Sequence, residues 1–91
     1  MDMAFEFDEN KSLSNKAKYG IDFIEAQSLW QDKSRLEVPA RTEDEFRFTV
    51  IAKVNFKMWA AVITYRDKDI RIISVRRARK REVELYESSR F

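Results

Sequence analysis

The spacing of hydrophobic residues changes along the chain and first predicts a short strand followed by helices. Residues 4–7 alternate weakly, as in a strand. Asp8 is placed to cap a polar helix that runs to about Tyr19, where Gly20 supplies the left-handed residue that ends it. A second helix is expected to start at once, because residues 22–25 read Asp-Phe-Ile-Glu and have the form of a capping box.

From residue 45 onward the hydrophobic period becomes two, as in half-buried strands. Three consecutive strands are predicted, over residues 46–54, 58–66 and 70–77, with turns at residues 55–57 and 67–69. Residues 33–41 hold the one proline and are expected to form an extended edge segment, because proline cannot donate a hydrogen bond to a neighbouring strand. After Ala78 the pattern becomes helical again.

This order of elements indicates an α+β fold. We expect two N-terminal helices and a short C-terminal helix, packed on a twisted antiparallel sheet. The sheet would consist of a three-stranded meander with a short N-terminal strand and an edge strand. At 91 residues the chain is long enough for one hydrophobic core and too short for two, so a single domain is expected over residues 1–91.

Two residue types are missing, and this excludes several kinds of chemistry. Without cysteine or histidine the chain has no disulfides, no thiolate zinc site and no imidazole for acid–base catalysis. No cofactor fingerprint is present, so neither a cofactor nor a metal site is expected. The longest uncharged apolar run, residues 58–65, is far too short to span a bilayer, and the acidic N-terminus is unlike a signal peptide. We therefore expect a cytoplasmic protein with no membrane partner.

Positive charge is concentrated toward the C-terminus. Residues 1–65 hold 9 basic and 11 acidic side chains, a balance of −2, whereas residues 66–91 hold 9 and 5, a balance of +4. Residues 71–81 contain six basic side chains and no acidic one. A local cationic surface of this kind suits a phosphate-rich partner, although a solvated strand end and helix would have the same composition.

The strand expected over residues 70–77 changes from apolar to cationic along both of its faces. Simple alternation places Arg76 on one face with Ile70, Ile72 and Ser74, and Arg77 on the other with Arg71, Ile73 and Val75. The two guanidinium groups would be held rigidly at the sheet margin, where their forked donors fit phosphate oxygens. The alternative is that one arginine pairs with Glu82 or another carboxylate and ties the last helix down.

The first predicted helix carries a second polar set. Lys11, Asn15 and Lys18 are spaced as i, i+4 and i+7 and would form one stripe, with Tyr19 beside its end. Such a stripe could face RNA, and an ordinary solvated helix face has the same pattern. Tyr86 would lie close to the strand-end arginines if the last helix folds back over the sheet, although tyrosines of this kind are more often core residues.

Cleavage of RNA needs no metal in principle. The adjacent 2′-hydroxyl can attack the phosphorus if a base takes its proton, cations stabilise the charged transition state and an acid protonates the leaving oxygen. Arginine and lysine suit the second of these roles. In a chain without histidine, the base would be a lysine, a tyrosine or a carboxylate with a shifted pKa.

Two groups of residues form a recognisable pattern. The first begins with Phe5-Glu6-Phe7-Asp8 and continues through Lys18 and Gly20 to Ala26. The second, which is the more specific, runs from Trp59 to Tyr86 and includes the sequence Arg-Ile-Ile-Ser-Val-Arg-Arg-Ala-Arg at residues 71–79. Together they span about residues 4–87. In these residues the chain resembles the BrnT family of bacterial type II toxins.

The resemblance implies a RelE-like toxin, a small ribonuclease that cleaves RNA without metal and arrests translation. It implies a BrnA-like antitoxin as partner, which carries a DNA-binding part, so that DNA is contacted only through the antitoxin. By position, the residues implied to line the RNA-facing region, and our candidates for catalysis, are Arg76, Arg77, Lys18 and Tyr86. With the helix stripe added, the further candidates for RNA binding are Arg66, Arg79, Lys11, Asn15 and Tyr19.

The chain departs from the family at the end of the first helix. Family members commonly show Lys-His-Gly there, whereas residues 18–20 read Lys-Tyr-Gly. Tyrosine has a far higher ordinary pKa than histidine and is a poorer proton shuttle at neutral pH. Ala52 and Phe56 also stand where glycines are frequent around the hairpin. The alternative function is therefore a non-catalytic basic module that docks an antitoxin-like partner or nucleic acid.

Overall fold

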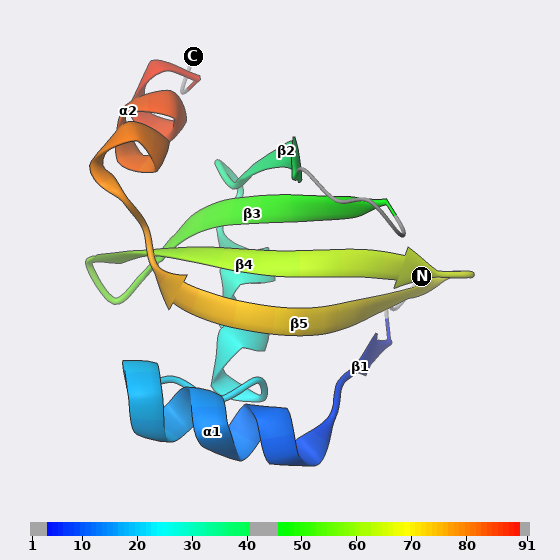
Figure 1. Cartoon of the computed structure of the whole chain (residues 1–91). Coiled ribbons are helices and arrows are strands. Elements are labelled where there is room, and N and C mark those ends of the chain that lie inside the picture. The colour runs from blue at the N-terminus through cyan, green and yellow to red at the C-terminus, as the bar shows by residue number, and fades with distance from the viewer. Residues whose placement is uncertain (1–3, 41–45, 90–91) are drawn as a thin grey trace.

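The computed structural model describes residues 4–40 and 46–89, which form a five-stranded sheet with three helical segments (Figure 1). In chain order the elements are β1 (Phe5–Glu6), α1 (Glu9–Tyr19), the 3-10 helix η1 (Glu25–Gln31), β2 (Leu36–Ala40), β3 (Arg47–Val54), β4 (Lys57–Arg66), β5 (Asp69–Arg77) and α2 (Lys80–Ser88). Among the described residues, no helix is long and apolar enough to cross a membrane.

The strands lie in the order β1-β5-β4-β3-β2. The pairs β2–β3, β3–β4 and β4–β5 are antiparallel, whereas β1 pairs with β5 in parallel. The α+β class is thus confirmed, but the prediction of a purely antiparallel sheet is wrong, because β1 makes the sheet mixed. The extended segment expected over residues 33–41 forms β2 at an edge of the sheet; Arg41 lies outside the described residues.

Local signals set the helix ends. Asp8 caps α1 by accepting a hydrogen bond from the Lys11 backbone N–H at 3.0 Å, and Gly20 ends it with a φ of 83°. In the expected capping box, the Glu25 N–H donates to Asp22 Oδ1 at 2.7 Å and the Asp22 N–H donates to Glu25 Oε1 at 3.0 Å. The segment that follows is a 3-10 helix, η1, and not a regular α-helix.

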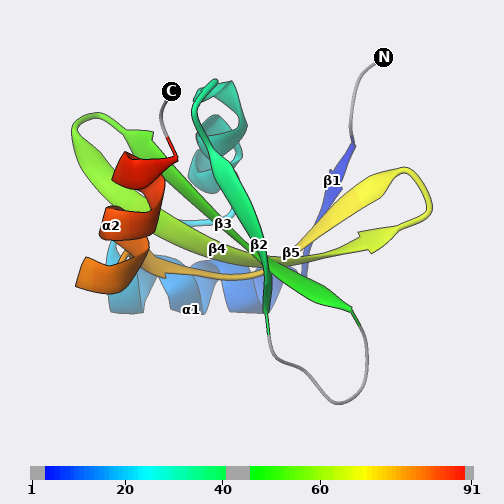
Figure 2. The same cartoon turned by 90° about the horizontal axis from the view of Figure 1, so that it is seen from above.

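The main core lies between the sheet and the two N-terminal helical segments. In Figure 1, α1 lies beside β5, and η1 packs against β3. The core residues are Ile21, Phe23, Ala26, Leu29, Val50, Ala52, Trp59, Ala61, Ile63, Ile70, Ile72 and Val75. α2 also packs against β3, and Figure 2 shows α2 at the end of the sheet that holds the β3–β4 hairpin. β3 thus contacts both η1 and α2, and β5 connects directly to α2.

β5 contains an irregularity that simple alternation did not predict. Val62 pairs with Ser74, but the next residue of β4, Ile63, pairs with Ile72. Ile73 is therefore an extra residue, as in a β-bulge, and the side chains that follow it change faces. Val75 is fully buried in the same core as Ile72, so the prediction that Val75 faces away from Ile72 is wrong.

Candidate functional site

Four chain segments meet at one end of the sheet: the end of α1, the β3–β4 hairpin, the end of β5 and the start of α2 (left side of Figure 1). The junction between β5 and α2 is fixed to β4, because the Ala78 N–H donates to the Met58 carbonyl at 2.9 Å. Most of the expected site residues come from these segments. The sheet therefore brings together groups that are far apart in sequence.

Arg77 lies at this end with its guanidinium on an aromatic ring. It pairs with Trp59 across β4 and β5, and its guanidinium carbon lies 5.4 Å from the centre of the Trp59 ring. Its Nε donates to the Met58 carbonyl at 3.4 Å. Arg77 is exposed, and within residues 4–40 and 46–89 no carboxylate forms an ion pair with it. Arg77 is therefore an exposed cation whose guanidinium lies against an aromatic ring.

Arg76 has a different environment. It pairs with Ala60, on the face opposite to Arg77, and its two Nη atoms donate to the two carboxylate oxygens of Glu82 at 2.8 Å each. The hydrogen bonds to Glu82 raise the pKa of Arg76, and the same bonds lower the pKa of the Glu82 carboxyl. Arg76 therefore holds α2 against β5. This is the alternative that the sequence left open, in which one arginine pairs with Glu82. The predicted grouping of Arg76 with Ile70 and Ile72 is wrong, because the bulge at Ile73 reverses it.

Asn15 does not face outward from α1. Its side chain is 6% exposed, and its Nδ2 donates to the carbonyls of Ile21 and Val75 at 2.8 Å each. Its Oδ1 accepts from the Val75 N–H at 3.2 Å. Because β1 pairs with β5 only at Ile70 and Arg71, Asn15 satisfies backbone groups farther along that edge. The prediction of an outward stripe is therefore wrong for Asn15, whose amide is occupied within the fold.

The remaining members of the α1 set are exposed. Lys18 and Tyr19 lie at the C-terminal end of the helix, and Lys18 Nζ is 5.2 Å from the centre of the Tyr19 ring. Lys11 is also exposed but lies two turns earlier, roughly 10 Å along the helix axis from Lys18. Lys18 and Tyr19 thus share the end of the sheet that holds Arg77.

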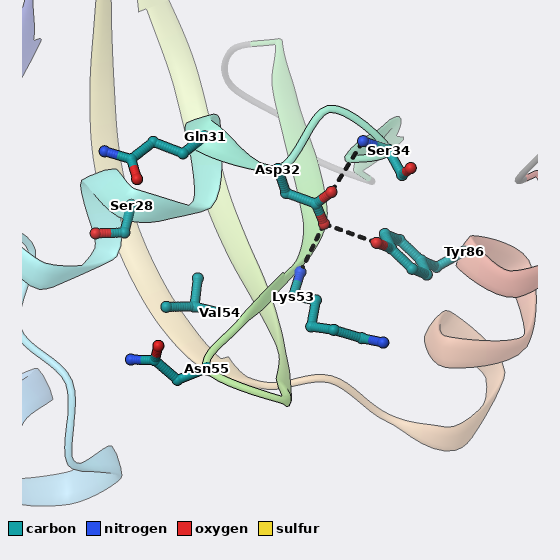
Figure 3. Close-up of a pocket in the computed structure, with 8 residues that line it drawn as sticks. All are labelled: Ser28, Gln31, Asp32, Ser34, Lys53, Val54, Asn55 and Tyr86. Atoms are coloured by element: carbon teal, nitrogen blue, oxygen red, sulfur yellow. Dashed lines mark hydrogen bonds between the residues drawn. The ribbon is translucent and has the colours of Figure 1, made fainter.

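Tyr86 is a buried residue of α2 whose hydroxyl points toward η1 and β3. It is 3% exposed, and its hydroxyl donates to Asp32 Oδ2 at 2.7 Å (Figure 3). Asp32 also accepts from the backbone N–H groups of Ser34 and Lys53, each at 2.9 Å. Sequence analysis missed Asp32. The sequence Asp-Lys-Ser is typical of an Asx turn, but nothing local indicates partners 21 and 54 residues away.

Two hollows flank the β3–β4 hairpin. The Tyr86 hollow, of about 480 Å³, is lined by Ser28, Gln31, Asp32, Ser34, Lys53, Val54, Asn55 and Tyr86 (Figure 3). The Trp59 hollow, of about 320 Å³, is lined by Gly20, Ile21, Glu25, Ser28, Val54, Asn55, Lys57 and Trp59. They share Ser28, Val54 and Asn55, so the base of the hairpin is a wall of both. The ring that supports Arg77 lines the second.

Arg66 and Arg79 lie in different places. Arg66 is at the far end of β4, roughly 23 Å from Trp59 for seven strand residues, with its Nε 3.9 Å from Glu6 Oε1. The expectation that Arg66 joins the strand-end arginines is therefore wrong. Arg79 is exposed at the start of α2, where its backbone N–H donates to Glu82 Oε1 at 2.8 Å. In the described part of the chain, no three acidic side chains gather as a metal site would require.

Comparison with known proteins identifies the family. The search of curated proteins gave no match. The family model of the ribonuclease toxin BrnT, of type II toxin–antitoxin systems, matches residues 7–82. The match includes Lys18, Arg76 and Arg77 and ends before Tyr86. The chain therefore belongs to the BrnT family of ribonuclease toxins of type II toxin–antitoxin systems.

Proposed function

We propose that this chain is an endoribonuclease toxin that cleaves RNA without a metal ion and arrests translation in the cytoplasm. In this proposal residues 1–91 form one RelE-like domain, and a BrnA-like antitoxin with a DNA-binding part neutralises it. One observation carries the proposal: in a chain of a ribonuclease toxin family, Arg77 holds an exposed cation on Trp59 beside a hollow.

Arg77 is the group best placed to bind a phosphate. A guanidinium offers forked donors that match two phosphate oxygens, and a rigid mount reduces the cost of orienting them. Arg77 has such a mount, because the strand, the Trp59 ring and the Met58 carbonyl fix its position. It would stabilise the negative charge that develops on the phosphate during attack by the 2′-hydroxyl.

The Tyr86–Asp32 pair is a second candidate group, for proton transfer. The hydroxyl and the carboxylate share a hydrogen bond of 2.7 Å in the wall of the Tyr86 hollow. The Tyr86–Asp32 pair lies beside β3, and Arg77 lies on β5. Because β3 and β5 are two strand spacings apart, roughly 10 Å separates the pair from Arg77. The two groups would therefore contact different parts of an RNA strand that crosses the hairpin.

The other candidates fall into two sets in this proposal. Lys18, Tyr19 and Arg79 are exposed near Arg77 and would contact the RNA backbone, with Lys11 at the periphery. Arg76 acts as a positioning residue that holds α2, because its guanidinium is occupied by Glu82.

A direct test is to induce the chain alone in bacteria and to follow growth and RNA integrity. Growth arrest with cleaved RNA, relieved when the antitoxin is co-expressed, is the expected result. Normal growth and intact RNA in cells that contain the soluble protein would contradict the proposal.

The second candidate, a non-catalytic basic module, is favoured by the tyrosine at position 19 and the lack of histidine. The Tyr19→His variant distinguishes the two functions. It should change cleavage little if the chain is already an active ribonuclease, and it should create or strongly raise cleavage if the histidine is what the site lacks.

A further inference from the structure

The tip of the β3–β4 hairpin has an unusual residue for its backbone conformation. Val54 pairs with Lys57, so Asn55 and Phe56 are the two central residues of the turn, and their φ angles are 50° and 69°. Two positive φ angles are typical of a type I′ turn, for which Asn-Gly is the favoured sequence. Asn55 fits this preference, but phenylalanine at the second position does not.

Neither the backbone nor the core explains Phe56. A side chain other than that of glycine is disfavoured at positive φ, especially a bulky one. Phe56 is also 97% exposed, so its ring gains almost nothing from burial. Strained backbone conformations of this kind cluster at active sites and at sites that clamp a ligand.

The residues next to Phe56 belong to the candidate site and include a lysine. Its neighbours Asn55 and Lys57 line the Trp59 hollow, and Asn55 also lines the Tyr86 hollow. Phe56 precedes Met58 by two residues, roughly 7 Å along the chain, and the Met58 carbonyl accepts from Arg77 Nε. The turn that carries Phe56 and Lys57 thus lies close in the chain to the residue that holds the proposed phosphate ligand.

We propose that Phe56 is a base-stacking residue: a base of the RNA strand that binds Arg77 stacks on its ring. This inference rests on the proposed function. Stacking on an aromatic ring tolerates any base, because every base has a π face, and it commonly accompanies a positively charged surface that tracks the backbone. The positive charge of Lys57 and Arg77 favours a nucleic acid over a protein partner.

The test measures binding of a 2′-O-methyl oligonucleotide that contains 2-aminopurine. The probe cannot be cleaved by 2′-hydroxyl attack, and its fluorescence falls when the base stacks. We expect the Phe56→Gly variant to bind the probe roughly tenfold more weakly and to lose the fluorescence quench. Its Tm should equal or exceed that of the wild type, because glycine fits the turn. Phe56→Trp should retain both affinity and quench.

Asp67→Gly is the matched control. Asp67 has a φ of 56° in the β4–β5 hairpin, at the opposite end of the sheet, so glycine relieves the same kind of strain far from the site. Its affinity for the probe should equal that of the wild type. If Phe56→Gly lowers both affinity and Tm, the side chain supports the fold, and the inference is overturned.

Failure of the inference and failure of the proposed function give different results. If the wild-type protein cleaves RNA while Phe56→Gly binds the probe as tightly as wild type, stacking alone is refuted. If that variant instead loses neutralisation by a co-expressed antitoxin, Phe56 contacts a protein, and stacking is again refuted. If the wild type neither binds the probe nor cleaves RNA, both proposals fail.

Discussion

Replacing Arg76 by alanine tests whether this residue holds α2 in place. The substitution removes two hydrogen bonds of 2.8 Å to Glu82, in a pair whose side chains are 22% and 17% exposed. Glu82 would keep the Arg79 N–H as a partner, with its carboxylate still largely shielded from water. Breaking a fully buried pair costs several kcal/mol and an exposed one almost nothing, so we expect a loss of about 2 kcal/mol in unfolding free energy at neutral pH.

The loss should depend on pH in a defined direction. The hydrogen bonds from Arg76 lower the pKa of the Glu82 carboxyl in the folded protein. A carboxyl with a lowered pKa contributes stability that is fully present above its unfolded pKa and is lost as the pH falls through its folded pKa. The difference between wild type and variant should therefore be full at neutral pH and shrink below about pH 4.3.

Urea unfolding of wild type and Arg76→Ala, at neutral pH and at about pH 3, measures both effects. Arg81→Ala is the control, because Arg81 is exposed on the same helix and its loss should cost less than about 0.5 kcal/mol. An equal loss of unfolding free energy at both pH values, or no loss at neutral pH, would refute the claim that Arg76 holds α2 through Glu82. Lost RNA cleavage in a variant of unchanged stability would instead give Arg76 a direct role in the reaction.

Four further substitutions test other parts of the structure. Asn15→Ala should lower the unfolding free energy by about 2–3 kcal/mol, measured in urea, because it leaves two carbonyls and an N–H buried without their partner; an unchanged value contradicts this. Gly20→Ala should cost about 1 kcal/mol, from the positive φ alone, since no atom lies within 4 Å of the added Cβ; a much larger loss would indicate a clash. Burial and the hydrogen bond to Glu37 raise the pKa of Tyr65 to about 12, so alkaline absorbance titration should show a late step that Tyr65→Phe lacks, with stability falling as the pH rises above the unfolded pKa. Tyr86→Phe should cost about 1 kcal/mol and shift the pH profile of cleavage; an unchanged profile would remove Tyr86 from proton transfer.

Features with local causes could be predicted from the sequence. Asp8 and Gly20 mark the ends of α1 through bonds within a few residues, and the capping box at Asp22 is equally local. The strands followed from a period of two, which reflects one buried face. The prediction that arginines stand at the end of β5 is confirmed for the same reason, because the residues at which a strand ends follow from the local sequence.

Features that depend on distant contacts could not be predicted. The bulge at Ile73 arises from pairing with β4, and it decides which arginine reaches Glu82 and which lies on Trp59. Asn15 bonds to Val75, 60 residues away, so its spacing on α1 gave no sign of burial. The parallel pairing of β1 likewise depends on the overall topology.

RNA cleavage by the purified chain in EDTA tests the central claim most directly. Comparison of the wild type with Arg77→Ala and the control Arg81→Ala separates loss of the proposed phosphate ligand from loss of one positive charge. We predict RNA fragments with 2′,3′-cyclic phosphate ends and at least a 100-fold slower reaction in Arg77→Ala, on the order of the loss of one transition-state donor. The Tm of Arg77→Ala should fall by only a few degrees, as expected from the loss of its contact with the Trp59 ring. A folded wild-type protein that leaves RNA intact, or an Arg77→Ala variant that cleaves at the wild-type rate, would contradict the account.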